Sequence, residues 1–132
     1  MKPVYQTKFG QGNGNCFQAA VASILELELD DVPDFCNLYS DDEWFNEFQK
    51  WLNKHFNAWC LAVNYKSIKN LPEYHPPGYV IMVGDSVRVH HAVVYKGKEL
   101  VHDPCKGGGG LVKIDDMFMI IPNDPIIVLG WQ

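Results

Sequence analysis

Hydrophobic residues recur at helical spacing in two segments of the N-terminal half of the chain. Between residue 16 and about residue 28, small and apolar side chains fall near one face and predict a helix that packs closely against a sheet; these are Ala19, Ala20, Ser23 and Leu27. Ser40 and Glu43 have the spacing of a capping box, so we expect a second helix to begin at Ser40. A buried face then follows at i, i+3, i+4 and i+7, formed by Trp44, Phe45, Phe48, Trp51, Leu52, His55 and Phe56.

After Asn57 the apolar pattern becomes typical of β-strands. We expect strands at residues 59–65, 79–84, 88–96 and 99–103, with shorter ones at 111–114 and 126–131. Gly97 and Lys98 predict a tight hairpin between the third and fourth of these strands. Because helices come first and hairpin-linked strands follow, the order predicts an α+β fold with a mainly antiparallel sheet.

Length and composition predict one folded domain over residues 1–132. The chain is 47% hydrophobic and shows neither an internal repeat nor a linker long enough to divide domains. The net charge of −5, with no basic run, argues against nucleic acid or an anionic membrane as a partner. The N-terminus is polar and no apolar run approaches the ~20 residues of a membrane span, so we expect a cytoplasmic protein with reduced cysteines.

The candidate chemistry begins with Cys16, which follows a glycine-rich loop and opens the first predicted helix. We expect Asn15 to cap that helix. The unpaired N–H groups and the dipole of a helix N-terminus favour a thiolate, which is a nucleophile that needs a base. The alternative interpretation is that Cys16 is a small buried core residue.

The predicted hairpin supplies a base and a group to orient it. His91 lies in its first strand and Asp103 ends its second, so the imidazole and carboxylate can meet at one end of the hairpin. His90 lies on the opposite face of the strand, and we interpret it as an exposed or hydrogen-bonded residue. The glycine run 107–110 that follows is either a flap over the site or a linker.

Three segments together resemble the papain-like cysteine peptidase superfamily, and most of all its small bacterial and phage branch, which includes domains that process bacteriocin leaders. They are residues 15–20 (NCFQAA), 91–95 (HAVVY) and 102–104 (HDP). The resemblance implies a papain-like fold, with Cys16 as nucleophile, His91 as general base and acid, and Asp103 as the orienting residue.

The same resemblance implies a glutamine in the oxyanion hole, about six residues before the cysteine. Position 10 is a glycine here, and the candidates are Gln6, which fits if the following loop bulges out, and Gln11, which fits if the loop is tight. The backbone N–H of Cys16 would be the second donor.

These residues predict a cysteine hydrolase that cleaves a peptide, isopeptide or amide bond of a peptide or protein through a thioester. Two alternatives stay open: an acyltransferase or transglutaminase-like enzyme with the same triad, and a non-catalytic protein-binding domain on the same fold. We expect no cofactor and no metal, since a ligand set of Cys16, His91, Asp103 and Cys105 lacks the close spacing of zinc sites. The sequence leaves the oligomeric state open.

Overall fold

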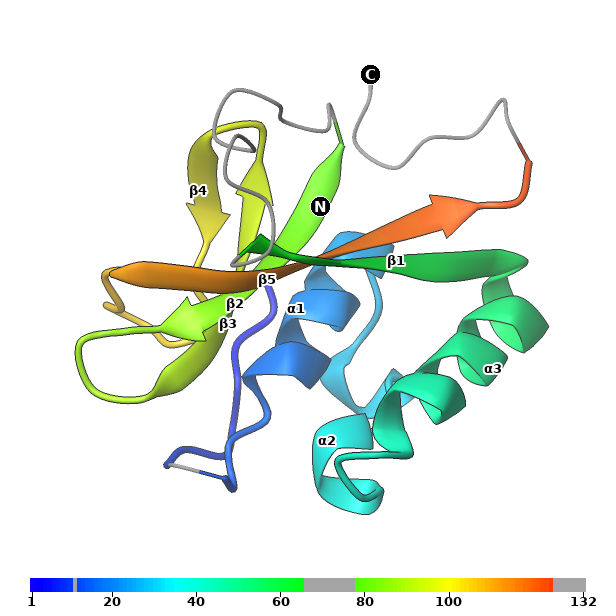
Figure 1. Cartoon of the computed structure of the whole chain (residues 1–132), viewed down its shortest axis with the longest axis horizontal. Coiled ribbons are helices and arrows are strands. Elements are labelled where there is room, and N and C mark those ends of the chain that lie inside the picture. Colours follow the sequence, from blue (N-terminus) through cyan, green and yellow to red (C-terminus); the bar gives the residue numbers. More distant parts are fainter. Residues whose placement is uncertain (11, 66–77, 125–132) are drawn as a thin grey trace.

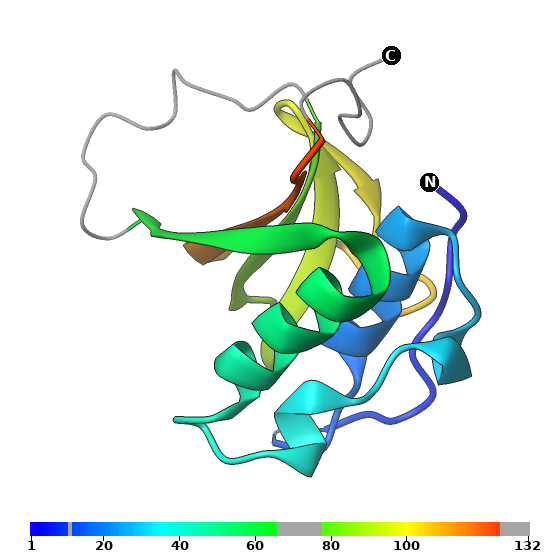
Figure 2. The same ribbon diagram turned by 90° about the vertical axis from the view of Figure 1, so that its right-hand side faces the viewer.

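The computed structural model describes residues 1–10, 12–65 and 78–124. Over these residues the protein is an α+β fold of three α-helices and a five-stranded antiparallel sheet (Figure 1). The helices lie on one side of the sheet, as the perpendicular view also shows (Figure 2). Within the described part of the chain, no helix is long and apolar enough to cross a membrane.

Helix α1 (Cys16–Leu25) is the central helix, and all its residues from 17 to 24 are buried. Ala19 and Ala20 are fully buried, and their small side chains let the helix contact strands β2 and β3. The helix ends three residues before the predicted boundary, because Glu26 adopts a left-handed backbone (φ 57°) and its N–H bonds back to the carbonyls of Ala22 and Ser23. A short 3₁₀ turn, Leu29–Asp31, follows.

Helices α2 (Phe35–Leu38) and α3 (Trp44–Phe56) complete the helical layer. Helix α3 begins four residues later than Ser40, because the Ser40 carbonyl accepts the N–H groups of Glu43 and Trp44 in a turn that precedes the helix. Phe48 and Leu52 are fully buried on its inner face, as the periodicity predicted, whereas His55 of the same predicted face is exposed.

The sheet has the strand order β1-β5-β2-β3-β4 and every neighbouring pair is antiparallel. The strands are β1 (Ala58–Asn64), β2 (Tyr79–Asp85), β3 (His90–Lys96), β4 (Glu99–His102) and β5 (Lys113–Pro122). The short strand expected at 111–114 is misplaced: β5 begins at Lys113, extends to Pro122 and lies between β1 and β2. Two aspartates, Asp115 and Asp116, interrupt its apolar pattern. The strand expected at 126–131 lies outside the described residues.

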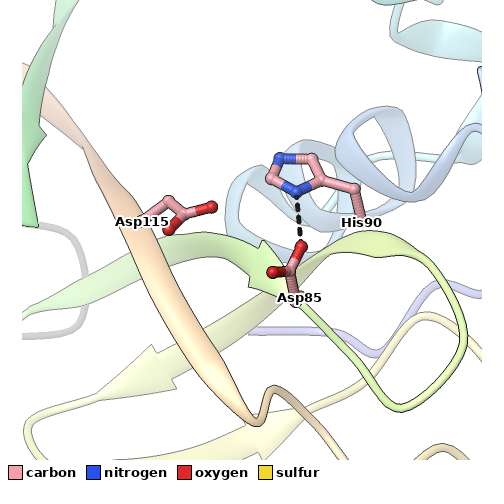
Figure 3. A group of neighbouring side chains, drawn as sticks. All are labelled: Asp85, His90 and Asp115. Atoms are coloured by element: carbon pink, nitrogen blue, oxygen red, sulfur yellow. Dashed lines mark hydrogen bonds and ion pairs between the residues drawn. The ribbon is translucent and has the colours of Figure 1, made fainter. Parts of the chain in front are cut away.

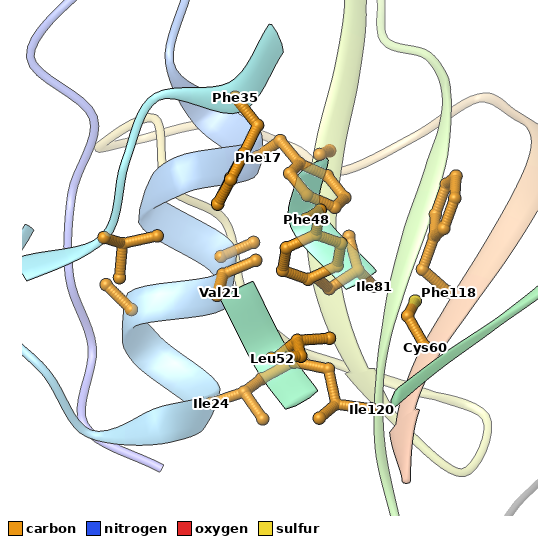
Figure 4. Packing of buried hydrophobic residues seen from close by; sticks show 14 of the residues in the cluster. Phe17, Val21, Ile24, Phe35, Phe48, Leu52, Cys60, Ile81, Phe118 and Ile120 are labelled. Atoms are coloured by element: carbon orange, nitrogen blue, oxygen red, sulfur yellow. The ribbon is translucent and has the colours of Figure 1, made fainter. Parts of the chain in front are cut away.

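Apolar side chains cover both faces of the sheet. On the helical side, the Phe17 ring makes edge contacts with Phe48 and Phe118 in the centre of the main cluster (Figure 4). A second cluster covers the opposite face of the sheet. Its strand residues alternate along the chain with the strand residues of the main cluster: Val80, Met82, Val93, Met117 and Met119. The main cluster therefore fixes α1, and with it Cys16, against the strands that carry the candidate base.

Candidate active site

Cys16 is the first residue of α1 and is partly buried. The residue before it does not cap the helix as predicted, because the Asn15 side chain bonds the N-terminal arm. Its Oδ1 accepts the backbone N–H groups of Thr7 (3.0 Å) and Lys8 (2.8 Å), and its Nδ2 donates to Gln18 Oε1 (3.1 Å). Asn15 therefore joins the arm to the helix start and fixes the loop that leads into Cys16.

His91 and Asp103 form a buried pair. His91 Nε2 lies 2.6 Å from Asp103 Oδ1, and the two side chains are 6% and 8% exposed. Since Nε2 is occupied by the carboxylate, Nδ1 is the ring nitrogen left for Cys16, which lines the same pocket as His91 and is close enough to raise the pKa of the imidazole. The structure thus brings Cys16, His91 and Asp103 together, from α1, β3 and the residue after β4.

The loop after Asp103 surrounds its carboxylate. Oδ1 accepts the N–H of Cys105 (2.9 Å) and Oδ2 accepts the N–H of Gly110 (3.0 Å). A Cβ on Gly108 would lie 2.4 Å from Asp103 Oδ2, so only glycine allows this close approach. The glycine run, predicted to be a flap or a linker, therefore forms a cradle that holds the orienting carboxylate in place.

The charge of the His91 ring depends on these neighbours. Burial opposes protonation of the imidazole, but the hydrogen bonds and negative charges of Cys16 and Asp103 outweigh it and raise the pKa of His91 to about 9. At neutral pH the ring is therefore an imidazolium between a sulfur and a carboxylate.

Cys16 and His91 line a pocket of about 350 Å³. Residues of the helical layer form one side of this pocket, and residues of strands β2, β3 and β5 form the other. Among the described residues that line it there is no lysine or arginine, whereas three are aspartates: Asp34, Asp41 and Asp116. Sequence reasoning missed these three. They come from the loop before α2, the turn before α3 and strand β5, and no spacing in the sequence connects them.

Cys36 shares this pocket with Cys16. Desolvation of its thiol, followed by the negative charges of Cys16, Asp34 and Asp41, raises the pKa of Cys36 to about 12. Burial likewise raises the pKa of Cys60 to about 12. Both are neutral thiols at physiological pH. Cys105 contacts Asp103 through its backbone N–H, and it is not among the residues that line the pocket.

The two glutamines proposed for the oxyanion hole have different outcomes. Gln6 does not line the pocket: its Nε2 donates to the Lys8 carbonyl (2.9 Å), and its Oε1 is buried without a hydrogen-bond partner among the described residues. Gln11 lies outside the described residues. The backbone N–H of Cys16 stays a candidate donor, since the first N–H groups of a helix lack partners within the helix.

The other two histidines of the hairpin have structural partners. His90 is about half exposed, and its Nδ1 lies 3.3 Å from Asp85 Oδ1 (Figure 3), which agrees with its interpretation as a hydrogen-bonded strand residue. His102 is buried, and its Nε2 lies 2.6 Å from the Val4 carbonyl oxygen. That bond and the edge contact of its ring with Tyr5 attach the N-terminal arm to β4.

In comparisons with known proteins, no family model, no curated protein and no solved structure matches the chain.

Proposed function

We propose that the protein is a papain-like cysteine hydrolase that cleaves a peptide, isopeptide or amide bond. The observation that carries the proposal is the position of the His91 imidazole, which bonds the carboxylate of Asp103 through Nε2 and lies beside Cys16 on the same pocket. A nucleophile, a base and an orienting group in contact are the arrangement that covalent acyl transfer requires.

In the proposed reaction the Cys16 thiolate attacks the carbonyl carbon of the substrate and a carbon–sulfur bond forms. As the carbon–nitrogen bond breaks, the His91 imidazolium gives its proton to the leaving amine, and a thioester remains on Cys16. The neutral imidazole then takes a proton from water, which attacks the thioester and releases the acid. Asp103 holds the ring and stabilises its cation without taking the proton.

The charge of the pocket supports a basic substrate. Asp34, Asp41 and Asp116 line the pocket beside Cys16, and Lys8 is paired with Asp34 at 3.5 Å. Several carboxylates around one cavity attract a positively charged group and disfavour an acidic one. We therefore expect a lysine, arginine or amine near the bond that is cleaved.

An amine attracted by the same carboxylates can also replace water as the acyl acceptor. An acyltransferase or transglutaminase-like enzyme is therefore the second candidate function. The deciding experiment incubates the protein with a proteome-derived peptide library, with and without a primary diamine, and identifies products by mass spectrometry. New termini that depend on Cys16 support hydrolysis, and amine adducts support transfer. If neither product differs between the wild type and Cys16→Ser, the proposed enzyme is wrong and a binding domain is favoured.

A further inference from the structure

Three potential metal ligands converge beside the candidate active site. Asp85 ends β2, His90 begins β3 and Asp115 lies in β5, and one ligand atom from each falls within 4.8 Å of the others. Figure 3 shows the Asp115 side chain extending from its strand toward the Asp85–His90 pair. The predicted site residues Cys16, His91 and Asp103 are not members of this group.

The position of Asp115 depends on an irregularity in the sheet. Val83 pairs with Asp116 but Gly84 pairs with Ile114, so Asp115 is the extra residue of a bulge in β5. A bulge turns a side chain away from the direction that strict alternation would give it. Gly84 permits the bulge, because a Cβ there would lie 1.9 Å from the Lys113 carbonyl oxygen.

The donors are of the types that bind first-row transition metals. The set contains one imidazole nitrogen and two carboxylate oxygens, a mixture that suits Zn²⁺, Co²⁺ or Mn²⁺ better than an all-oxygen site would. Bonds of about 2.0–2.2 Å put neighbouring ligand atoms about 3–3.5 Å apart, and Asp85 Oδ1 and His90 Nδ1 are already 3.3 Å apart. The ligand atom of Asp115 lies within 4.8 Å of both, so it must move closer to complete that spacing.

Charge and exposure also fit a bound cation. Two carboxylates lie beside the imidazole. The Lys113 amine, 3.5 Å from Asp115 Oδ1, balances part of their negative charge. The Asp115 side chain is only 14% exposed, whereas those of His90 and Asp85 are 47% and 51% exposed. The group therefore has one sheltered carboxylate and an open side through which water can complete the coordination of a metal.

We propose that Asp85, His90 and Asp115 form a binding site for a divalent first-row transition-metal ion. The site is separate from the chemistry proposed for Cys16 and does not depend on it. Because His90 also lines the pocket, a bound ion would hold the start of β3 next to His91.

The test is a titration of untagged Cys16→Ser protein with Co²⁺, which removes the nearby thiol as a competing ligand. We expect one equivalent to bind, with visible d–d absorption and without the sulfur-to-metal charge-transfer band of a thiolate site. His90→Gln and Asp115→Asn should each weaken binding by about tenfold or more, because each removes a direct ligand. Asp116→Asn, at the next position of β5, is the matched control and should bind like the parent.

Circular dichroism of the metal-free variants shows whether each is folded, and Asp85→Asn replaces any variant that is not. The proposal is overturned if the folded parent shows no saturable binding up to about 1 mM Co²⁺. It is equally overturned if the ligand variants bind as tightly as Asp116→Asn.

Discussion

Asp103 lies on the same side of the hairpin as His91 because the pairing of β3 with β4 shifts by one residue. Tyr95 pairs with Leu100, but Val94 pairs with His102. Without the shift, Asp103 would lie opposite Ala92, on the other face of the strand from His91. With it, alternation puts the carboxylate on the face of Val93 and His91, and the 2.6 Å contact follows.

Selective alkylation tests whether Cys16 is the reactive thiol. At pH 6 and limiting iodoacetamide, we expect Cys16 to be modified before the other three cysteines, because it lines an open pocket beside the His91 ring, where the proposed nucleophile lies. Cys60 should react slowest, since it is buried and the pKa of its thiol is raised to about 12. Cys36 is exposed, but its raised pKa of about 12 should keep it behind Cys16. Peptide mapping by mass spectrometry measures the order, and labelling of Cys36 ahead of Cys16 would contradict an activated nucleophile.

Neighbouring histidines provide a matched pair of variants. Cys16→Ala should abolish turnover, and His91→Gln should cost nearly as much, because the members of a triad act as a unit. Asp103→Asn should cost about 10²–10⁴-fold, since it orients the ring without taking its proton. His90→Gln should stay close to wild type in kcat/KM, because its Nδ1 faces Asp85. A larger loss of kcat/KM for His90→Gln than for His91→Gln would show that His91 is not the base.

The raised pKa of His91 predicts a limit at alkaline pH. The active form needs the imidazolium as the acid that protonates the leaving amine, so kcat/KM should fall as pH rises through about 9. The ring's own titration, followed by NMR, should have its midpoint near 9 rather than 6.5. Asp103→Asn should move that midpoint down, because it removes one of the charges that hold the proton.

The raised pKa of His91 also makes the free energy of unfolding depend on pH. A histidine whose pKa is higher in the folded protein adds stability that is fully present below its ordinary value of 6.5 and is lost as pH rises through about 9. Urea unfolding at pH 6 and pH 9.5 measures the difference. His91→Gln should show a smaller decrease in stability over this window than wild type, and an equal decrease would mean that another group is responsible.

Two adjacent glycines test the cradle around Asp103. Gly108→Ala puts a Cβ about 2.4 Å from Asp103 Oδ2, whereas Gly109→Ala meets nothing within 4 Å. We expect Gly108→Ala to lower activity at least tenfold and to destabilise the fold by about 1–3 kcal/mol, because the carboxylate must move. Gly109→Ala should resemble wild type in both measurements. Equal effects of the two variants would show that contact between Gly108 and the Asp103 carboxylate is not needed for activity.

The acidic pocket predicts a preference for basic substrates. For a peptide that is cleaved, replacing a lysine near the scissile bond with glutamate should lower kcat/KM by at least tenfold, and added salt should narrow the difference. Asp116→Asn should weaken the preference while leaving alkylation of Cys16 intact, because it changes the pocket and not the nucleophile. A preference that is unchanged in Asp116→Asn would exclude this residue from substrate selection.

The sequence by itself determined the local elements and the candidate chemistry. Periodicity identified α1, the inner face of α3 and four of the strands, because burial imposes a repeat of 3.6 or 2 on nearby residues. It also singled out Cys16, His91 and Asp103, whose residue types and chain order are informative without coordinates. It misplaced β5, since Asp115 and Asp116 break the apolar alternation there, and it misassigned Asn15, whose partners Thr7 and Lys8 lie in the preceding arm.

Only the tertiary structure decided which side chains meet. The strand order, the two register shifts and the convergence of Asp34, Asp41 and Asp116 on one pocket all depend on contacts between segments far apart in the chain. The same holds for the role of Gly108, which is a turn residue in the sequence and a neighbour of the Asp103 carboxylate in space. Local patterns report whether a residue is buried, but pairing between distant elements fixes what it is buried against.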